Sequence, residues 1–243
     1  MKTQWRYRLA AAGFALSLLF ILFVTSFEAV CYRMPGLYEK EFRKYNVLEN
    51  LRVWRGEEMD MDGLNTVMKE TMSFLRGDRE NLIVEVPIDG RVQEFYNEDE
   101  ISHMTDVRVL FVLCIRLRYA AAAICLGLAF YIIRGTHRDW VYVLSRGFLR
   151  VCGVILLAVL ALGLLISTNF SKYFVVFHEI FFSQGNWMFD VTKSRMIDIM
   201  PEEFFSDIAG LIAVTFLVSV VILLVLAILA ERKMKPSGRR GQV

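Results

Sequence analysis

The stretch IAGLIAVTFLVSVVILLVLAIL, residues 208–229, decides the fold class of this chain. It carries no charged side chain, and it meets the roughly 20 apolar residues that an α-helix needs to cross the hydrocarbon core of a bilayer. Three further apolar runs precede it, at 9–27, 109–133 and 148–166. We therefore predict an all-α membrane bundle of four transmembrane helices.

The composition agrees with this fold class. Of the 243 residues, 56% are hydrophobic and 22% are charged, and the mean hydropathy of +0.43 is outside the range of soluble globular proteins. The net charge of +2 is too small to indicate nucleic acid as a partner. The four cysteines show no metal-binding or redox spacing, so we expect no metal site built on them.

Basic residues predict the orientation of the bundle, because short loops rich in Lys and Arg stay in the cytoplasm. The connection at 168–207 is acidic, whereas both ends of the chain and the connection at 134–147 are basic. The basic residues at these places are Lys2, Arg6, Arg8, Arg134, Arg138, Arg146, Arg232, Lys233, Lys235, Arg239 and Arg240. We predict that both termini are cytoplasmic and that the first run is a retained anchor, since it is too long for a signal peptide.

This orientation divides the chain into five parts. They are an N-terminal tail with the first span (1–32), an extracytoplasmic cap (33–107), two spans with a basic cytoplasmic loop (108–167), an aromatic extracytoplasmic loop (168–207), and the last span with a basic tail (208–243). In the last loop, Pro201 followed by two glutamates predicts the start of the helix that becomes the fourth span.

The cap is predicted to be a small α+β domain. Met61, Leu64, Met68, Met72 and Leu75 recur at helical spacing. Alternation of Leu82, Val84, Val86 and Ile88 is typical of a strand, and the Asp89–Gly90 pair that follows predicts a hairpin turn.

The aromatic stretch YFVVFHEIFFSQGNWMFD, residues 173–190, contains a histidine that a plain transmembrane helix would lack. The predicted topology places this residue, His178, at the outer membrane boundary together with His103. Asp106 follows His103 by three residues, so a helix that begins near Asn97 would put both on one face, where the carboxylate could hold one ring nitrogen. The alternative is that these are ordinary amphipathic side chains of the membrane interface.

Three other polar residues were considered for a functional role. His137 lies in the basic cytoplasmic loop, where we expect it to be solvated. Arg116 and Arg118 lie within the second run, where each could pair inside the bundle or contact a lipid headgroup or carboxylate.

No common catalytic motif is present. The chain lacks a Gly-rich phosphate loop, an H-E-x-x-H motif and a G-x-S-x-G motif. His103, Asp106, His178 and Glu179 could bind a metal ion, but their spacing is unspecific. What remains is a base without a protein nucleophile, which suits a reaction whose substrate supplies its own nucleophile.

Two long strings of sequence resemble the lipoprotein intramolecular transacylase (Lit) family, four-span integral membrane proteins of low-GC Gram-positive bacteria. They are DEISHMTDVRVLF (99–111) and FHEIFFSQGNWMFDVTKSRMIDIMPEEFF (177–205). The resemblance implies an acyltransferase without a cofactor, located in the cell membrane with its active site at the extracytoplasmic face. Its substrates would be diacylated bacterial lipoproteins, presented within membrane lipid.

The implied reaction moves the sn-2 acyl chain of a diacylglyceryl-cysteine onto the α-amine of the same cysteine, giving a lyso-form lipoprotein. The resemblance places the two catalytic histidines at His103 and His178. For supporting or substrate-binding roles we single out Asp106, Glu179, Arg91, Asn186 and Trp187. No family tyrosine can be placed, since Tyr7 falls at the cytoplasmic end.

This chemistry agrees with the residue types. The attacking amine must be neutral, and a histidine with a pKa near 6.5 can take its proton and later return one to the leaving alkoxide. Two alternatives stay open: a non-catalytic membrane scaffold or sensor, and a metal-dependent outer-leaflet hydrolase.

Overall fold

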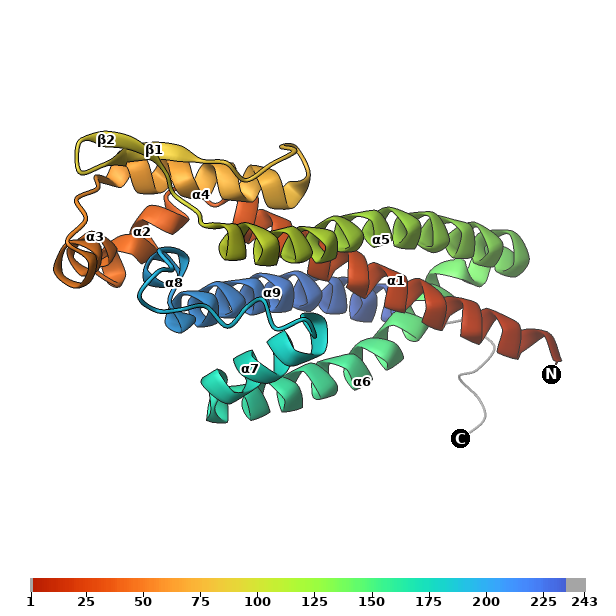
Figure 1. The fold of residues 1–243 in the computed structure, drawn as a ribbon. Helices are drawn as coiled ribbons and strands as arrows, with labels where there is room; N and C mark the ends of the chain where they lie inside the picture. The colour runs from red at the N-terminus through yellow and green to blue at the C-terminus, as the bar shows by residue number, and fades with distance from the viewer. Residues whose placement is uncertain (1, 235–243) are drawn as a thin grey trace. The chain divides into compact units, whose positions relative to one another are not determined.

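The computed structural model describes residues 2–234, with side chains from Trp5 onward. Three of the predicted basic residues, Lys235, Arg239 and Arg240, lie outside the described residues, as does the side chain of Lys2. The chain forms mostly helices (Figure 1), with a single pair of strands in its described part. In order, they are α1 (Lys2–Arg33), α2 (Leu37–Lys44), α3 (Val47–Asn50), a π-helical turn η1 (Leu51–Arg55), α4 (Met61–Arg76), β1 (Glu85–Ile88), β2 (Arg91–Glu94), α5 (Glu98–Thr136), a 3-10 turn η2 (His137–Asp139), α6 (Trp140–Thr168), α7 (Phe170–Phe181), α8 (Met196–Ile199) and α9 (Glu202–Met234).

The chain divides into two compact units, which are described separately. The first, the apolar unit, contains residues 2–27, 116–168 and 212–234. Within the described residues, three helical stretches are long and apolar enough to cross a membrane: Trp5–Arg33, Glu98–Thr168 and Glu202–Met234. The second of these joins α5 to α6 through η2, where His137 is exposed, as predicted.

Small residues allow the helices of the apolar unit to approach closely. A Cβ atom on Gly147 of α6 would lie 2.5 Å from the Cβ of Ala11 in α1, so only glycine fits this contact. Elsewhere the surface of the unit is apolar: Leu126 is 72% exposed and Leu157 is 74% exposed. Exposed apolar surface of this kind indicates contact with lipid.

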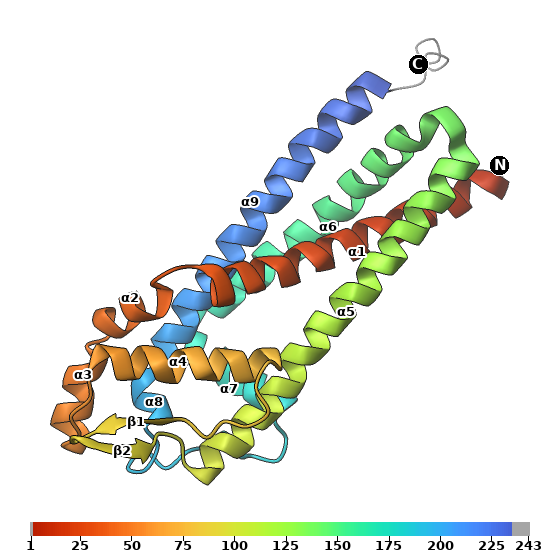
Figure 2. The same ribbon diagram turned by 90° about the horizontal axis from the view of Figure 1, so that it is seen from above.

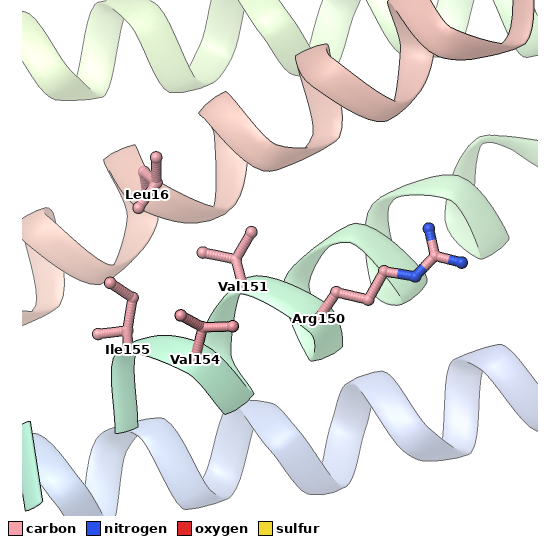
Figure 3. Close-up of a pocket in the computed structure, with 5 residues that line it drawn as sticks. All are labelled: Leu16, Arg150, Val151, Val154 and Ile155. Atoms are coloured by element: carbon pink, nitrogen blue, oxygen red, sulfur yellow. The ribbon is translucent and has the colours of Figure 1, made fainter. Parts of the chain in front are cut away.

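The arginines of the second run lie in this unit. Arg116 is exposed, while Arg118 is half-buried with its guanidinium 5.2 Å from the centroid of the Tyr119 ring. A shallow groove of about 360 Å³ runs between α1 and α6 (Figure 3). Leu16, Val151, Val154 and Ile155 line it, and Arg150 lies at its edge. None of the histidines lines this groove.

The second compact unit, the polar unit, contains residues 28–115 and 169–211, so the two segments predicted to be extracytoplasmic belong to one body. Its core brings together apolar side chains of the first segment, such as Leu64 and Ile88, and of the second, such as Ile199 and Phe204. The strand β1 packs on α4, as both ribbon views show (Figure 2).

The predicted helix and hairpin are confirmed. Asp60 caps α4 by accepting from the backbone N–H of Gly63 at 2.7 Å, and Gly77 ends the helix with a φ of 92°. β1 pairs with β2 in an antiparallel register that sets Ile88 opposite Arg91. Asp89 and Gly90 have φ values of 53° and 70°, the left-handed pair that a tight hairpin turn requires.

The element boundaries differ from the predicted parts in two ways. α1, α5 and α9 run without a break through the predicted boundaries at 32, 107 and 207. The segment expected to be an aromatic loop contains a 12-residue helix, α7. Asn169 caps it by accepting from the backbone N–H of Lys172 at 3.0 Å, and Phe170, Phe174 and His178 recur at four-residue spacing along one side. As predicted, α9 begins directly after Pro201.

Candidate active site

A buried glutamate fixes the start of the helix that carries His103. Asn97 and Glu100 form a reciprocal capping pair: the backbone N–H of Asn97 donates to Oε2 of Glu100 at 2.8 Å, and that of Glu100 donates to Oδ1 of Asn97 at 3.0 Å. The other carboxyl oxygen, Oε1, accepts from the Ser194 hydroxyl at 2.6 Å and the Met196 backbone N–H at 2.8 Å. Glu100 therefore holds the 194–196 turn against the first turn of α5.

Two arginines strengthen this connection. Arg195 donates to both carboxyl oxygens of Glu57, at 2.8 and 2.9 Å. Arg55 donates to the carbonyls of Val191, Thr192 and Ser194 and also pairs with Asp198. Sequence reasoning missed all three anchors. The N-x-x-E spacing at 97–100 is a recognisable capping pattern, but it gives no sign of the partners near residue 195.

The two histidines lie next to each other in a box of aromatic rings. The ring centroids of His103 on α5 and His178 on α7 are 5.8 Å apart, with an angle of 29° between the planes. Both side chains belong to buried residues. The surrounding rings are Phe182 and Phe189 against His103, at 4.7 and 5.6 Å, and Phe174 and Trp187 against His178, at 4.2 and 5.0 Å.

His178 has a defined hydrogen bond. Its Nδ1 lies 2.7 Å from the carbonyl oxygen of Phe174. A carbonyl can only accept, so Nδ1 carries the proton and Nε2 of the neutral ring keeps its lone pair. Burial lowers the pKa of His178, while the Phe174 carbonyl and the negative charge of Glu202 act in the opposite direction.

His103 is held more strongly in the neutral form. Burial, and secondarily the nearby His178, lowers its pKa from 6.5 to about 4, against smaller opposing effects of Asp106 and Asn186. Two buried polar atoms of this site have no hydrogen-bond partner within the described part of the chain: Nδ1 of His103 and Oδ1 of Asn186. The ring nitrogen can donate a hydrogen bond when it carries a proton, and the amide oxygen can accept one.

Asp106 holds the loop that follows α7. Its Oδ2 accepts from the amide of Gln184 at 2.5 Å and from that of Asn186 at 2.7 Å. The same Asn186 nitrogen lies 3.3 Å from the Ser102 hydroxyl. Because the amide nitrogen is committed to these two acceptors, the amide oxygen is the atom left for His103. The carboxylate thus contacts the amides of the loop, and no hydrogen bond joins it to either imidazole among residues 2–234.

The remaining two candidates, Glu179 and Arg91, have exposed side chains. Glu179 is exposed and makes no hydrogen bond or ion pair with the described residues. Arg91 is exposed beside the hairpin turn. Over the described residues, no three side chains of His, Cys, Asp or Glu are gathered as they would be around a metal ion.

Comparison with known proteins gives a consistent result. A family model described as "Lipoprotein intramolecular transacylase Lit" matches residues 12–205. The fold is similar to an in meso structure of the membrane integral lipoprotein intramolecular transacylase Lit from Bacillus cereus, with a TM-score of 0.74 and 23% identity over 94% of this chain and 97% of that one.

Two further structures of the Bacillus cereus protein carry an alanine or an arginine in place of one histidine. Each has a TM-score of 0.70 and 23% identity, covering 95% of this chain and 96% or 94% of the other. At this identity the structural likeness establishes the fold. No curated protein sequence matches the chain.

Proposed function

The chain belongs to the lipoprotein intramolecular transacylase family, and we propose that it moves the sn-2 acyl chain of a lipoprotein's diacylglyceryl-cysteine to the α-amine of that cysteine. Membership of the family makes the protein a membrane acyltransferase. The donor ester, the acceptor amine and the two histidines as catalytic residues are the parts that we propose. The observation that carries them is the buried pair of imidazoles, whose ring centroids are 5.8 Å apart.

The hydrogen bonds of the site support a role for Nε2 on both rings. On His178 the Phe174 carbonyl already fixes the proton on Nδ1. On His103 the free amide oxygen of Asn186 favours a proton on Nδ1 in the same way. Asp106 prevents a 180° flip of that amide, because it accepts a hydrogen bond from the amide nitrogen. Each neutral ring would then present the lone pair of Nε2 to the substrate.

The reaction needs one proton to be moved and no external nucleophile. The α-amine nitrogen attacks the sn-2 ester carbonyl, a C–N bond forms, and a histidine accepts the proton that the nitrogen loses. When the tetrahedral intermediate collapses, the C–O bond to the glycerol breaks. The sn-2 oxygen then receives a proton from the histidine pair. The products are an amide and a free hydroxyl, with the total mass unchanged.

We assign the first proton transfer to His178. Burial lowers the pKa of both rings, but on His178 the Phe174 carbonyl opposes this effect, whereas the pKa of His103 falls to about 4. His103 takes this proton over from the His178 imidazolium and, as the stronger acid once protonated, returns it to the sn-2 alkoxide, so both rings end in the neutral form in which they began. Because amine and ester belong to one molecule, the remaining task of the protein is to hold them in a reactive geometry.

The proposed topology has four spans, at 9–27, 109–133, 148–166 and 208–229, with both termini in the cytoplasm. In support, the 71-residue apolar stretch Glu98–Thr168 is divided by the turn η2, which suits two spans and not one. The polar unit, with the site, would then face the outside as the cap. Diacylated lipoproteins would enter it from the outer leaflet.

The proposal can be tested in a bacterium that makes diacylated lipoproteins and lacks this activity. The chain is expressed there, and the N-terminal peptides of the lipoproteins are analysed by tandem mass spectrometry. We expect one acyl chain to move from glycerol to the α-amine without a change in total mass. Unaltered peptides, from cells in which the protein is shown to be inserted, would overturn the proposal and favour the scaffold reading. Loss of a fatty acid with an unmodified amine would indicate a hydrolase instead.

A further inference from the structure

The helix α7 has a second, exposed apolar side, of which Phe177 alone has a ring in contact with His178, at 5.6 Å between the ring centroids. Its inner side carries His178 and the phenylalanines one and two turns before it. Val176 and Ile180, one turn apart, are 37% and 68% exposed, and Phe177 and Phe181, also one turn apart, are 45% and 50% exposed. The ring centroids of the two phenylalanines lie 4.7 Å apart, so these four residues form a continuous apolar stripe.

The same helix has a polar edge. Lys172 and Glu179 are seven residues apart, which places them on one side of an α-helix, and both are exposed. At 12 residues, or about 18 Å, α7 is too short to cross the roughly 30 Å hydrocarbon core. An apolar stripe with a charged edge on a helix of this length is typical of a helix that lies in the plane of a membrane surface.

The chain connection argues for lipid as the contact of this stripe. Only Asn169 separates the end of α6 at Thr168 from the start of α7 at Phe170. Two residue steps reach at most about 7 Å, so α7 begins at the membrane boundary of a segment that is apolar enough to span it. The stripe begins at Val176, six residues or about 9 Å of helix further on, so it lies within reach of the same leaflet.

We propose that α7 is an interfacial helix whose stripe of Val176, Phe177, Ile180 and Phe181 is immersed in the acyl chains of one leaflet. His178 lies beside this stripe on the same helix, with its ring centroid 5.6 Å from that of Phe177, and is then held close to the boundary between headgroups and acyl chains. This last consequence rests on the proposed function. It implies that the diacylglyceryl group of the substrate enters sideways from the leaflet, without leaving the membrane.

The test compares two stripe positions with two edge positions of the same helix. Single cysteines are placed at Val176, Ile180, Lys172 and Glu179 in a background whose four native cysteines are replaced by alanine. Each is labelled with a nitroxide in lipid nanodiscs. Collision rates with oxygen, which concentrates in hydrocarbon, and with a water-soluble nickel chelate are then measured by power-saturation electron paramagnetic resonance.

At the stripe positions we expect oxygen collisions to exceed nickel collisions several-fold, with the reverse at the edge positions. Nickel collisions as frequent at the stripe as at the edge would overturn the proposal. Protection of the stripe from both reagents would also overturn it and would indicate a second copy of the chain or another protein as the cover. The collision measurement needs no substrate, so it is independent of the acyl-transfer assay. Lipid contact of α7 without acyl transfer would contradict only the proposed function. Acyl transfer by a protein whose α7 stripe is exposed to water would contradict only this inference.

Discussion

Each of the two compact units is stabilised internally by a different kind of contact. In the apolar unit, helices meet through side chains as small as Ala11 and Gly147, and much of the surface is exposed apolar side chain. In the polar unit, the carboxylates Glu100 and Asp106 each join elements that are far apart in the sequence by two or more hydrogen bonds. The bundle needs only apolar surface and close approach, whereas the candidate site needs particular polar atoms at particular places.

This difference has a consequence for substitutions. A lipid-facing leucine can be exchanged for many apolar residues without leaving a polar atom unsatisfied. A member of the polar network cannot be exchanged in this way, because each buried donor or acceptor that loses its partner costs about 1–3 kcal/mol. We therefore expect single changes in the polar unit to have larger effects than changes in the apolar unit.

The largest effect is expected for the two histidines. His103→Ala or His178→Ala should lower acyl transfer by about 10²–10⁴-fold, the usual contribution of a positioned acid or base. Transfer is measured by mass spectrometry of lipoprotein N-terminal peptides, with the amount of inserted protein determined in parallel. His137→Ala, in the exposed turn between α5 and α6, is the matched control and should retain full activity. Normal transfer by either of the first two variants would contradict the proposed roles.

The next effect is on stability, at Glu100. Glu100→Ala removes the acceptor of Ser194, Met196 and Asn97 together, so we expect the free energy of unfolding to fall by about 3–5 kcal/mol. Thermal unfolding of the detergent-solubilised protein measures this change. Glu98→Ala, in the same helical turn but exposed, should change it by less than about 0.5 kcal/mol. Equal effects of the two substitutions would mean that the network does not join the two segments.

A smaller effect is expected from Asn186. Asn186→Leu keeps a similar volume but removes the amide side chain that raises the pKa of His103. Loss of an orienting partner typically costs about 10- to 100-fold in activity. We expect this loss in the rate at saturating lipoprotein, together with a lower melting temperature, because Asp106 also loses the hydrogen bond from the amide. An Asn186→Gln variant, whose amide keeps a donor for Asp106 and an acceptor for the ring, should recover part of the rate. If the Leu and Gln variants transfer acyl chains at the same rate, the amide oxygen has no positioning role.

The pH dependence of stability tests the lowered pKa of the buried His103 in the polar unit. The folded pKa of His103, about 4, lies below the roughly 6.5 of an unfolded histidine. Between these two pH values the unfolded chain binds a proton that the folded chain does not. The contribution of His103 to the free energy of unfolding is therefore complete above about pH 6.5 and is lost as the pH falls to about 4. We expect a loss of about 1–3 kcal/mol over this window. The matched variant His103→Gln should lose less over the same range in thermal unfolding, and identical curves would contradict the shifted pKa.

The sequence predicted local features better than the contacts between distant segments. Apolar runs, the Asp89–Gly90 turn and the helix start after Pro201 each depend on neighbouring residues, and the structure has the hairpin and these helices where they were expected. The proximity of His103 to His178 was inferred from topology and family resemblance. The contacts of Glu100 with Ser194 and of Arg55 with the 191–198 segment link residues more than 90 positions apart. No local pattern encodes such pairings, because they arise only when the two segments pack.

The last prediction concerns a close approach of two helices within the apolar unit. Gly147→Ala would place a methyl group 2.5 Å from the Cβ of Ala11 and 3.2 Å from its backbone, so α1 and α6 would have to separate. Overpacking of this kind costs about 1–3 kcal/mol. Gly153→Ala, six residues further along the same helix, meets nothing within 4 Å and should raise stability by up to about 1 kcal/mol, because alanine is the better helix former. If close helix approach stabilises this unit, thermal unfolding should show a lower melting temperature for Gly147→Ala and a higher one for Gly153→Ala. A stabilising Gly147→Ala would show that the contact is loose and that the apolar unit is specified by its apolar surface alone.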